Sequence, residues 1–505
     1  MNDKDNRILR RRKRDLARRL APRAWPEQPR PMLRAQNIQY EMADRTRAIP
    51  CGGIGAFHVL AERVGLVDEL NRRQSLLKVH LPYHESDHVL NIAYNTLTGG
   101  TCLDDIALRR DDEAYLDALG AERVPAPTTA GDFTRRFDED DVVALMDGVN
   151  AIRPKLWRQR LRRAERREAV LDVDGTVAPT AGECKEGMDI AYNGVWGYHP
   201  LLVSLANTAE PLFLVNRPGN RPSHDGAAEW IDRAVALVRP TFRKVYLRGD
   251  TDFALTAHFD RWSKRGVKFA LGMDAMPNLV AIAEGIEERR WKPLRRRIKR
   301  PAAGEPRRRP ENVKERIVRE REYKNIRLVS EHVAEFPYRP GKCSRDYRVV
   351  VVRKNLSVER GERVLFDDVR YFFTITNIEN KSAAQIVLFA NDRCNQENLI
   401  DQLKNGLNAL RMPVGDLVSN WAYMVMASLA WTLKTWFALM LPITPRWRDK
   451  HEAERNLVLR MEFRTFVQQL VMVPAQILRS GRRIVFRLLA WRSRLTLLFR
   501  LLDAV

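Results

Sequence analysis

Short apolar runs separated by turn residues begin near residue 168, and they constrain the fold more than any other feature of the sequence. The runs "AVLDVDGTV", "HPLLVSLANT" and "PLFLVNR" are rich in β-branched and other apolar residues, which is typical of consecutive strands. Helix and strand patterns then alternate, at 225–239 (helix), 244–250 (strand), 253–266 (helix) and 268–273 (strand). This order predicts the α/β class, with a mixed sheet and helices packed against it.

The chain before this sheet reads as helical. Residues 1–50 are rich in Arg and Pro and are predicted to form a basic arm with some helix. Residues 51–165 read as short helices joined by tight turns, and the last of these in "PAPTTAGDFTRRF" carries Arg135 and Arg136. This arrangement would suit a helix-turn-helix domain that binds DNA, although any small helical bundle would give the same pattern.

The chain after residue 273 predicts an interruption of the sheet. A densely basic, proline-broken stretch begins near 286, and strand patterns follow at 345–355 and 368–377. We therefore expect a sheet domain over 166–440, with a strand-rich insertion at about 275–370. The Arg-rich part at 290–310 would either grip DNA or form a solvated loop.

The last part of the chain also reads as helical. The apolar run at 421–433 is followed by Lys434, so it predicts a buried core helix better than a membrane span. Residues 441–505 interleave Arg with bulky apolar residues and are expected to be helical. They would cover a partner or DNA, or pack back on the body of the protein.

The charge balance favours a polyanionic partner. Lys plus Arg number 87 against 64 acidic residues, which gives a formal net charge of +23. Double-stranded DNA is the expected partner, although a protein from a generally basic proteome would have the same surplus of positive charge. The five cysteines are scattered without a Cys-x-x-Cys pair, and the N-terminus has no apolar targeting region. We therefore expect a cytoplasmic, nucleoid-associated protein without membrane contact.

Three carboxylates stand out by their positions. Asp174 lies near the end of the first strand, on the same face as Asp172, and Asp250 ends the strand at 244–250. Glu397 lies on an amphipathic helix, on the polar face opposite a leucine-rich stripe. Together Asp174, Asp250 and Glu397 would give oxygen ligands to a pair of Mg²⁺ ions. The alternative is that each Asp caps a following helix and Glu397 is solvated.

A second motif carries a different chemistry. His84-Glu85-x-x-His88 has the spacing of a zinc peptidase, with two histidine ligands and a glutamate base. Pro82 precedes it by two residues, so a helix is expected to begin near His84. We then expect Ser86 or Asp87 to cap that helix and His88 to be partly buried.

The ordered segments "DVDGT", "YLRGDTDF" and "RCNQENLIDQLK" resemble the DDE transposases of bacterial insertion sequences. The resemblance is to the group with a Tyr-x2-Arg-x3-Glu-x6-Lys signature, which Arg393, Glu397 and Lys404 match, while Ala390 occupies the tyrosine position. It covers about residues 50–440 and includes "GTCLDDI" and "PAPTTAGDFTRRF". It implies a ribonuclease-H-like core with a β-rich insertion, which the 147 residues between Asp250 and Glu397 would hold.

The resemblance also implies roles for individual residues. Asp174, preferred over Asp172, would be catalytic and a metal ligand together with Asp250 and Glu397, with Asp401 as a possible stand-in for Glu397. The metal would be Mg²⁺, with Mn²⁺ able to substitute. Arg393 and Lys404 would hold DNA phosphates, as charge-assisted donors suit. The residues that would lie behind the ligands or contact DNA are Asn395, Asn398 and Arg248.

The implied function is transposition. The enzyme would bind the terminal inverted repeats of an insertion sequence, cleave the DNA strand, and use the freed 3′-hydroxyl to attack target DNA. The family expectation is a homodimer in the synaptic complex. The alternatives are a catalytically inactive, DNA-binding derivative of a transposase, or the zinc peptidase.

Overall fold

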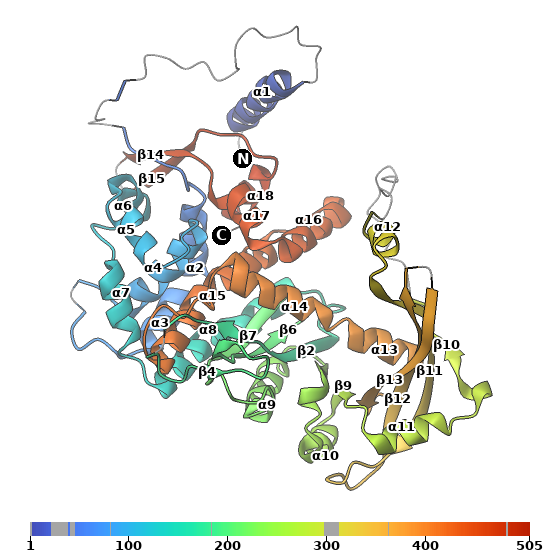
Figure 1. The fold of residues 1–505 in the computed structure, drawn as a ribbon. Helices are drawn as coiled ribbons and strands as arrows, with labels where there is room; N and C mark the ends of the chain where they lie inside the picture. The colour runs from blue at the N-terminus through green and yellow to red at the C-terminus, as the bar shows by residue number, and fades with distance from the viewer. Residues whose placement is uncertain are drawn as a thin grey trace.

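The structure is a computed structural model. It describes residues 3–21, 39–40, 46–80, 82–182, 184–296, 313–361, 363–480 and 483–504. Its centre is a mixed sheet, with the N-terminal helices on one side and a long β-ribbon projecting on the other (Figure 1). The predicted α/β class is therefore confirmed. Most of the Arg-rich 290–310 stretch lies outside the described residues.

The core of the sheet comes from the five predicted strands. In spatial order they are β7 (Glu210–Val215), β6 (Leu201–Leu205), β2 (Glu168–Gly175), β8 (Lys244–Gly249) and β9 (Val267–Met273). Of these five strands, the first three in chain order, β2, β6 and β7, are paired antiparallel, whereas β8 and β9 run parallel to β2. The predicted helices α9 (Ala227–Val238) and α10 (Thr256–Lys264) connect these strands. Parallel neighbours need such crossover helices, because a hairpin cannot join them.

The chain leaves this core after β9 to build the ribbon and then returns beside β9. The ribbon consists of β11 (Lys324–Tyr338), β12 (Tyr347–Arg360) and β13 (Arg363–Thr376), paired antiparallel. The end of β13 pairs with β9, and α13 (Ala383–Asn391) then leads back to the core (Figure 1). The sequence predicted β12 and β13 but missed β11, because charged residues interrupt its apolar pattern and its first half is exposed.

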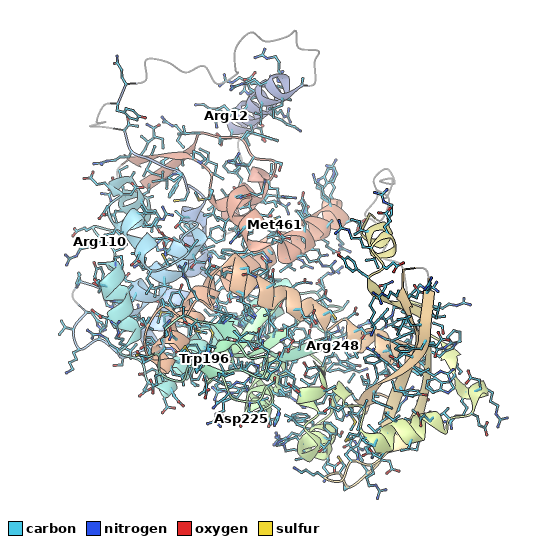
Figure 2. All side chains as sticks on the ribbon, in the orientation of Figure 1. Arg12, Arg110, Trp196, Asp225, Arg248 and Met461 are labelled. Atoms are coloured by element: carbon cyan, nitrogen blue, oxygen red, sulfur yellow. The ribbon has the colours of Figure 1, made fainter. Side chains whose placement is uncertain are left out.

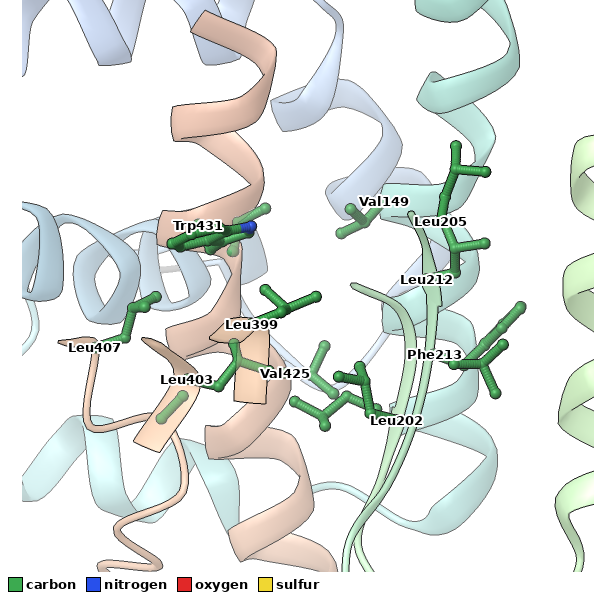
Figure 3. Close-up of a cluster of buried hydrophobic side chains, with 14 of the residues drawn as sticks. Val149, Leu202, Leu205, Leu212, Phe213, Leu399, Leu403, Leu407, Val425 and Trp431 are labelled. Atoms are coloured by element: carbon green, nitrogen blue, oxygen red, sulfur yellow. The ribbon is translucent and has the colours of Figure 1, made fainter. Parts of the chain in front are cut away.

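Two long helices cover the sheet. α8 (Glu139–Arg160) and α15 (Leu417–Met440) both contact β7, and α15 is buried from Ser419 onward. The predicted buried core helix is thus confirmed. The stripe Leu399, Leu403 and Leu407 packs beside α15 (Figure 3), which confirms the apolar face predicted for the helix that carries Glu397.

In the part of the chain that the structure describes, no single helix is long and apolar enough to cross a membrane, although α15 and Pro445–Arg460 pass that test together as a pair bent by 108°.

The N-terminal region is helical as predicted, but in shorter pieces. The predicted helix at 54–73 is two helices, α2 (Ile54–Arg63) and α3 (Leu66–Arg73), because Gly65 between them adopts φ +80°. The next predicted helix is α4 (Glu85–Leu97), and the third is broken into η1 (Asp104–Ile106), α5 (Ala107–Arg110) and α6 (Glu113–Leu119). α7 (Pro127–Thr134) follows, with proline at its first position.

The expectation that 441–505 is wholly helical is wrong. This region contains α16 (Arg448–Arg460), α17 (Phe463–Phe466) and α18 (Leu495–Leu502), but also the hairpin strands β14 (Ala475–Ser480) and β15 (Arg483–Leu488). The short strand β1 (Ala48–Ile49) pairs with β14 and completes a three-stranded sheet. The alternation of apolar and polar residues in "AQILRS" has the period of a strand, and Ser480 and Gly481 precede β15.

The predicted basic arm includes one well-defined helix, α1 (Asp3–Leu20). Arg12 on α1 donates a hydrogen bond to the carbonyl of Leu488 at 2.8 Å, so this helix touches the C-terminal hairpin (Figure 2). The other residues of the arm at 22–38 and 41–45 lie outside the described residues. The division of the chain into the four predicted domains stays a prediction.

Candidate active site

Asp174 and Asp250 lie together at one edge of the sheet. Asp174 is on β2, one residue before its end, and Asp250 directly follows the neighbouring parallel strand β8. Parallel strands end at the same edge, so the two side chains are brought close although 76 residues separate them in sequence. Asp250 Oδ1 also accepts a hydrogen bond from the amide of Asp252 at 3.1 Å, so it caps the short helix that follows as well.

Arg393 lies between these two carboxylates. Its Nη1 atom is 3.4 Å from Asp174 Oδ2 and 3.7 Å from Asp250 Oδ2. Burial and the charge of Asp250 raise the pKa of Asp174 to about 7, against the opposing charge of Arg393. Burial also raises the pKa of Asp250. The two carboxylates thus share a site that carries too little positive charge to keep both of them readily ionised.

Glu397 lies on α14 (Cys394–Asp401), the helix that begins immediately after Arg393, and its side chain is exposed. Its charge is one of the influences that raise the pKa of Asp174, so it acts on the same site. Asp401 instead accepts a hydrogen bond from Asn405 Nδ2 at 2.7 Å, within its own helical segment. Glu397 therefore remains the better candidate for the third carboxylate.

Lys404 lies in a π-helical turn at Gln402–Gly406, which directly follows α14. It is half-buried, and burial lowers its pKa while the charge of Asp174 opposes that shift. A π-helical turn breaks the regular spacing of a helix, and such turns occur frequently at functional sites. The charges of Lys404 and Asp174 thus influence one another, and the contact of Lys404 with DNA stays a prediction.

A buried network that the sequence analysis missed lies directly beneath the carboxylates. Arg248 Nε and Nη2 donate to the two carboxylate oxygens of Asp172, at 2.6 and 2.8 Å, and Arg248 Nη1 donates to the carbonyl of Phe389 at 2.9 Å. Gln396 Nε2 donates to the carbonyls of Asp172 and Leu202, both at 3.1 Å. The network ties β2, β6, β8 and α14 together. Its signal in the sequence was a pair of opposite charges, Asp172 and Arg248, inside two otherwise apolar strand segments.

The prediction that Arg248 contacts DNA does not fit this geometry. Arg248 is 4% exposed, and its hydrogen bonds to Asp172 and to the carbonyl of Phe389 hold it beneath the surface. Figure 2 labels its place in the molecule. The physical reason for this burial is that α13 covers this face of the sheet, since Arg248 Nη1 donates to the carbonyl of Phe389 on α13 and the guanidinium lies 5.1 Å from the centroid of the Phe389 ring. The remaining part of that prediction, a role behind the metal ligands, agrees with its place.

The other predicted DNA contacts are exposed. Asn395 and Asn398 are on the exposed side of α14, and Asn395 Nδ2 donates to the carbonyl of Asp392 at 2.8 Å. Arg135 and Arg136 directly follow α7 in the N-terminal region, where Arg135 pairs with Asp132 at 2.6 Å. The contacts of these four residues do not link them to Asp174 or Asp250, and their contact with DNA stays a prediction.

The His84-Glu85-x-x-His88 motif does not form a peptidase site. His88 is buried and stacks on Phe133, with ring centroids 4.2 Å apart, and burial lowers its pKa to about 4. Glu85 Oε1 accepts the amides of Leu76 and Leu77, both at 3.1 Å. The helix begins at Glu85, and Asp87 caps it by accepting the amide of His84, which confirms the helix start predicted from the sequence.

Metal-ligating atoms gather most tightly elsewhere. Among the residues that the structure describes, the one set of three whose ligand atoms lie within 4.8 Å of one another is His80, His84 and Glu85. The carboxylates of Asp174, Asp250 and Glu397 are therefore further apart than that. They suit a hard divalent cation by chemistry, since they are oxygen donors and the raised pKa of Asp174 marks a shortage of positive charge there.

The family model for the transposase DDE domain, group 1, matches residues 48–504, which includes the C-terminal region that the sequence resemblance did not reach. Among solved structures, the chain is similar to a piggyBac transposase synaptic complex with hairpin DNA, with a TM-score of 0.38, 10% identity, and coverage of 84% of this chain and 83% of that one. No curated protein matches. Because the family model spans nearly the whole chain, the protein belongs to the transposases with a group 1 DDE domain.

Proposed function

We propose that this transposase binds the terminal inverted repeats of an insertion sequence and catalyses metal-dependent DNA strand cleavage and strand transfer. The observation that carries the proposal is the pairing of Asp174 and Asp250 at adjacent strand ends, around one guanidinium, with the Glu397 helix beside them. The strand order β7-β6-β2-β8-β9, with its three antiparallel strands and two parallel strands, supports the ribonuclease-H-like core expected from the resemblance.

Asp174, Asp250 and Glu397 would hold the divalent metal, Mg²⁺ or Mn²⁺ in its place. When bound, a metal pair activates the attacking oxygen and stabilises the leaving oxygen of a phosphodiester. Asp174 must lose its proton to become a ligand, and because burial raises its pKa to about 7, metal binding would release that proton near neutral pH. Arg393 partly offsets the charge of the two aspartates and would be free to turn to a DNA phosphate once a metal takes over that task.

Lys404 would bind a backbone phosphate next to the cleaved bond, because its half-buried ammonium is close enough to Asp174 for their charges to interact. Arg393, Glu397 and Lys404 keep the spacing of the Tyr-Arg-Glu-Lys signature, which supports membership of that group. Ala390, at the tyrosine position, is partly buried against the ribbon side of α13, so this chain would lack one contact of the signature.

The partners follow from the same proposal. Both the element ends and the target would be double-stranded DNA, which the net charge of +23 favours. A homodimer would hold two ends in one synaptic complex, and the protein would work in the cytoplasm, associated with the nucleoid. The bacterial insertion-sequence origin is part of the proposal.

The test uses a duplex that carries the element's terminal inverted repeat, incubated with Mg²⁺ or Mn²⁺. We expect Asp174→Asn, Asp250→Asn and Glu397→Gln each to lower the cleavage rate by roughly a hundredfold or more, while binding of the end persists. Asp401→Asn is the matched control, because Asp401 lies on the same helix and is exposed, and it should keep its activity. A wild-type protein that binds the end but never cuts it would establish the inactive derivative instead.

A further inference from the structure

Three side chains with metal-binding atoms meet between two helices of the N-terminal region. His80 lies in the irregular chain that joins α3 to α4, and His84 and Glu85 lie at the start of α4. One ligand atom from each of the three side chains lies within 4.8 Å of the other two. The candidate active site uses none of these residues, so the set is a separate feature of the molecule.

Glu85 is held in place before any ligand arrives. It is 1% exposed, and its Oε1 atom accepts the amides of Leu76 and Leu77, both at 3.1 Å. Its Oε2 atom lies 3.1 Å from His80 Nε2. Burial opposes the effect of these partners, yet the hydrogen bond from Leu77 and the other contacts lower the pKa of Glu85. The carboxylate is therefore ionised, with one oxygen fixed by the backbone and the other directed to the imidazole, as in a pre-oriented metal ligand.

The two imidazoles lie face to face beside this carboxylate. The ring centroids of His80 and His84 are 4.6 Å apart, and the ring planes differ by 19°. Two protonated rings at this distance would repel one another, so the arrangement favours a neutral ring, which is the form that binds metals. The side chain of His80 is 47% exposed and His84 is exposed as well. An ion can therefore reach both rings, and the rings can turn without disturbing the core.

The donor set and its spacing fit Zn²⁺. Around one tetrahedral zinc ion, neighbouring ligand atoms stand about 3.3 Å apart. His80 and Glu85 already have that spacing, and the remaining pairs need to close by at most about 1.5 Å. Two imidazole nitrogens with one carboxylate oxygen suit Zn²⁺ better than Mg²⁺, which prefers oxygen alone. The positive end of α4 opposes a cation, and the charge of Glu85 offsets it.

We propose that His80, His84 and Glu85 bind one Zn²⁺ ion, which fastens the chain between α3 and α4 to the start of α4. The site differs from that of a zinc peptidase, because Glu85 is a ligand here and not a base, while His88 is buried against Phe133. Since α4 packs against α15, the ion would stabilise the helical region on the body of the protein. The proposal is independent of the proposed function.

The test is calorimetric titration of the metal-stripped, full-length protein with Zn²⁺, in excess Mg²⁺ that competes at the candidate active site. We expect one Zn²⁺ per chain, with a Kd on the order of micromolar or lower. His80→Ala and His84→Ala should each weaken binding by roughly a hundredfold or more, because each removes a ligand. The matched control is His224→Ala, at an exposed histidine before α9, which should bind like wild type, as should Asp174→Asn.

A second measurement tests the fastening. Zn²⁺ should raise the free energy of unfolding of the wild type in urea and leave that of His80→Ala unchanged, since only a folded site binds the ion. Circular dichroism of His80→Ala in the absence of zinc should match that of the wild type, because this side chain lies at the surface.

The outcomes also separate this proposal from the proposed function. Equal Zn²⁺ binding by wild type and His80→Ala would mean an adventitious ion only and would reject the site. Binding that His80→Ala abolishes, without any effect of zinc on the stability of the wild type, would reject the fastening. Binding that depends on His80, in a wild-type protein that cuts no DNA, would support the zinc site and reject the catalytic function.

Discussion

Gln396 shows how a single side chain can place the third carboxylate. It is 3% exposed and directly precedes Glu397, and its amide donates to the carbonyls of Asp172 on β2 and Leu202 on β6. The helix is thereby fastened to the strand that carries Asp174. An amide is needed there, because a carboxylate has no proton to donate to either carbonyl.

We therefore expect Gln396→Glu to cost about 1–3 kcal/mol of unfolding free energy at pH 8, from two lost buried hydrogen bonds. Part of the loss should return at pH 5, where the new carboxyl group is protonated and can donate once. Urea unfolding at both pH values, together with the cleavage rate, measures this. Gln468→Glu, at an exposed glutamine, is the matched control. Equal stability of the two variants would show that Gln396 is no anchor.

Among the elements, α15 holds the sheet and the helical regions together. Trp436 on α15 and Arg153 on α8 both donate to the carboxylate of Glu210 on β7, which is fully buried. Lys434 on α15 donates to the carbonyl of Leu459 on α16 at 3.0 Å, and its ammonium lies 3.6 Å from the centroid of Trp431. These contacts join elements far apart in the sequence into one body.

Lys434 should make stability depend on pH. Burial lowers its pKa from 10.5 to about 7 in the folded protein. Between these two values the unfolded chain binds a proton that the folded chain does not, so the free energy of unfolding rises with pH from about 7 to 10.5. Lys434→Met should remove this rise. Its free energy of unfolding should exceed that of the wild type by the largest amount at pH 6. Urea unfolding from pH 6 to 10 measures it, with exposed Lys450→Met as control. The same pH slope in Lys434→Met would refute the assignment.

At the scale of the whole molecule, a positive surplus surrounds an acidic site. The net charge is +23, yet the active-site edge of the sheet gathers Asp174, Asp250 and Glu397. The positive charge of the protein surface would attract DNA. DNA could approach the carboxylates only where Arg393, Lys404 and a bound metal offset their negative charge. Attraction of this kind arises from the release of counterions from the DNA, and it is strongly sensitive to salt.

DNA binding should therefore weaken steeply with salt. A contact with 6–10 phosphates predicts a loss of roughly 10³–10⁵ in affinity between 50 and 200 mM NaCl. Lys404→Gln should make the slope of log affinity against log salt shallower by about one unit, if Lys404 holds one phosphate. Fluorescence anisotropy with a labelled duplex gives both slopes. A nearly flat salt dependence of the wild type would contradict a phosphate-based interface.

The sequence by itself determined the parts that depend on local periodicity. The five core strands and the helices between them follow from short apolar runs and turn residues, and each was predicted close to its observed place. The stripe of the Glu397 helix and the start of α4 followed in the same way, because the spacing of apolar residues and the capping groups act within one or two turns.

Only the tertiary structure decided the features that depend on distant partners. Arg248 was expected either behind the metal ligands or at a DNA surface, and the buried ion pair with Asp172 on the next strand decides for the first of these places. Residues 475–488 were expected to be helical and are strands: β14 and β15 pair with one another, and Ala48 and Ile49, more than 400 residues earlier, add a third strand to β14. Asp250 and Glu397 are 147 positions apart in the sequence. The ribbon brings the chain back to the core between them, because β13 pairs with β9 beside β8. Such pairings are set by the hydrogen bonds and charges of the partner strand, which local sequence does not contain.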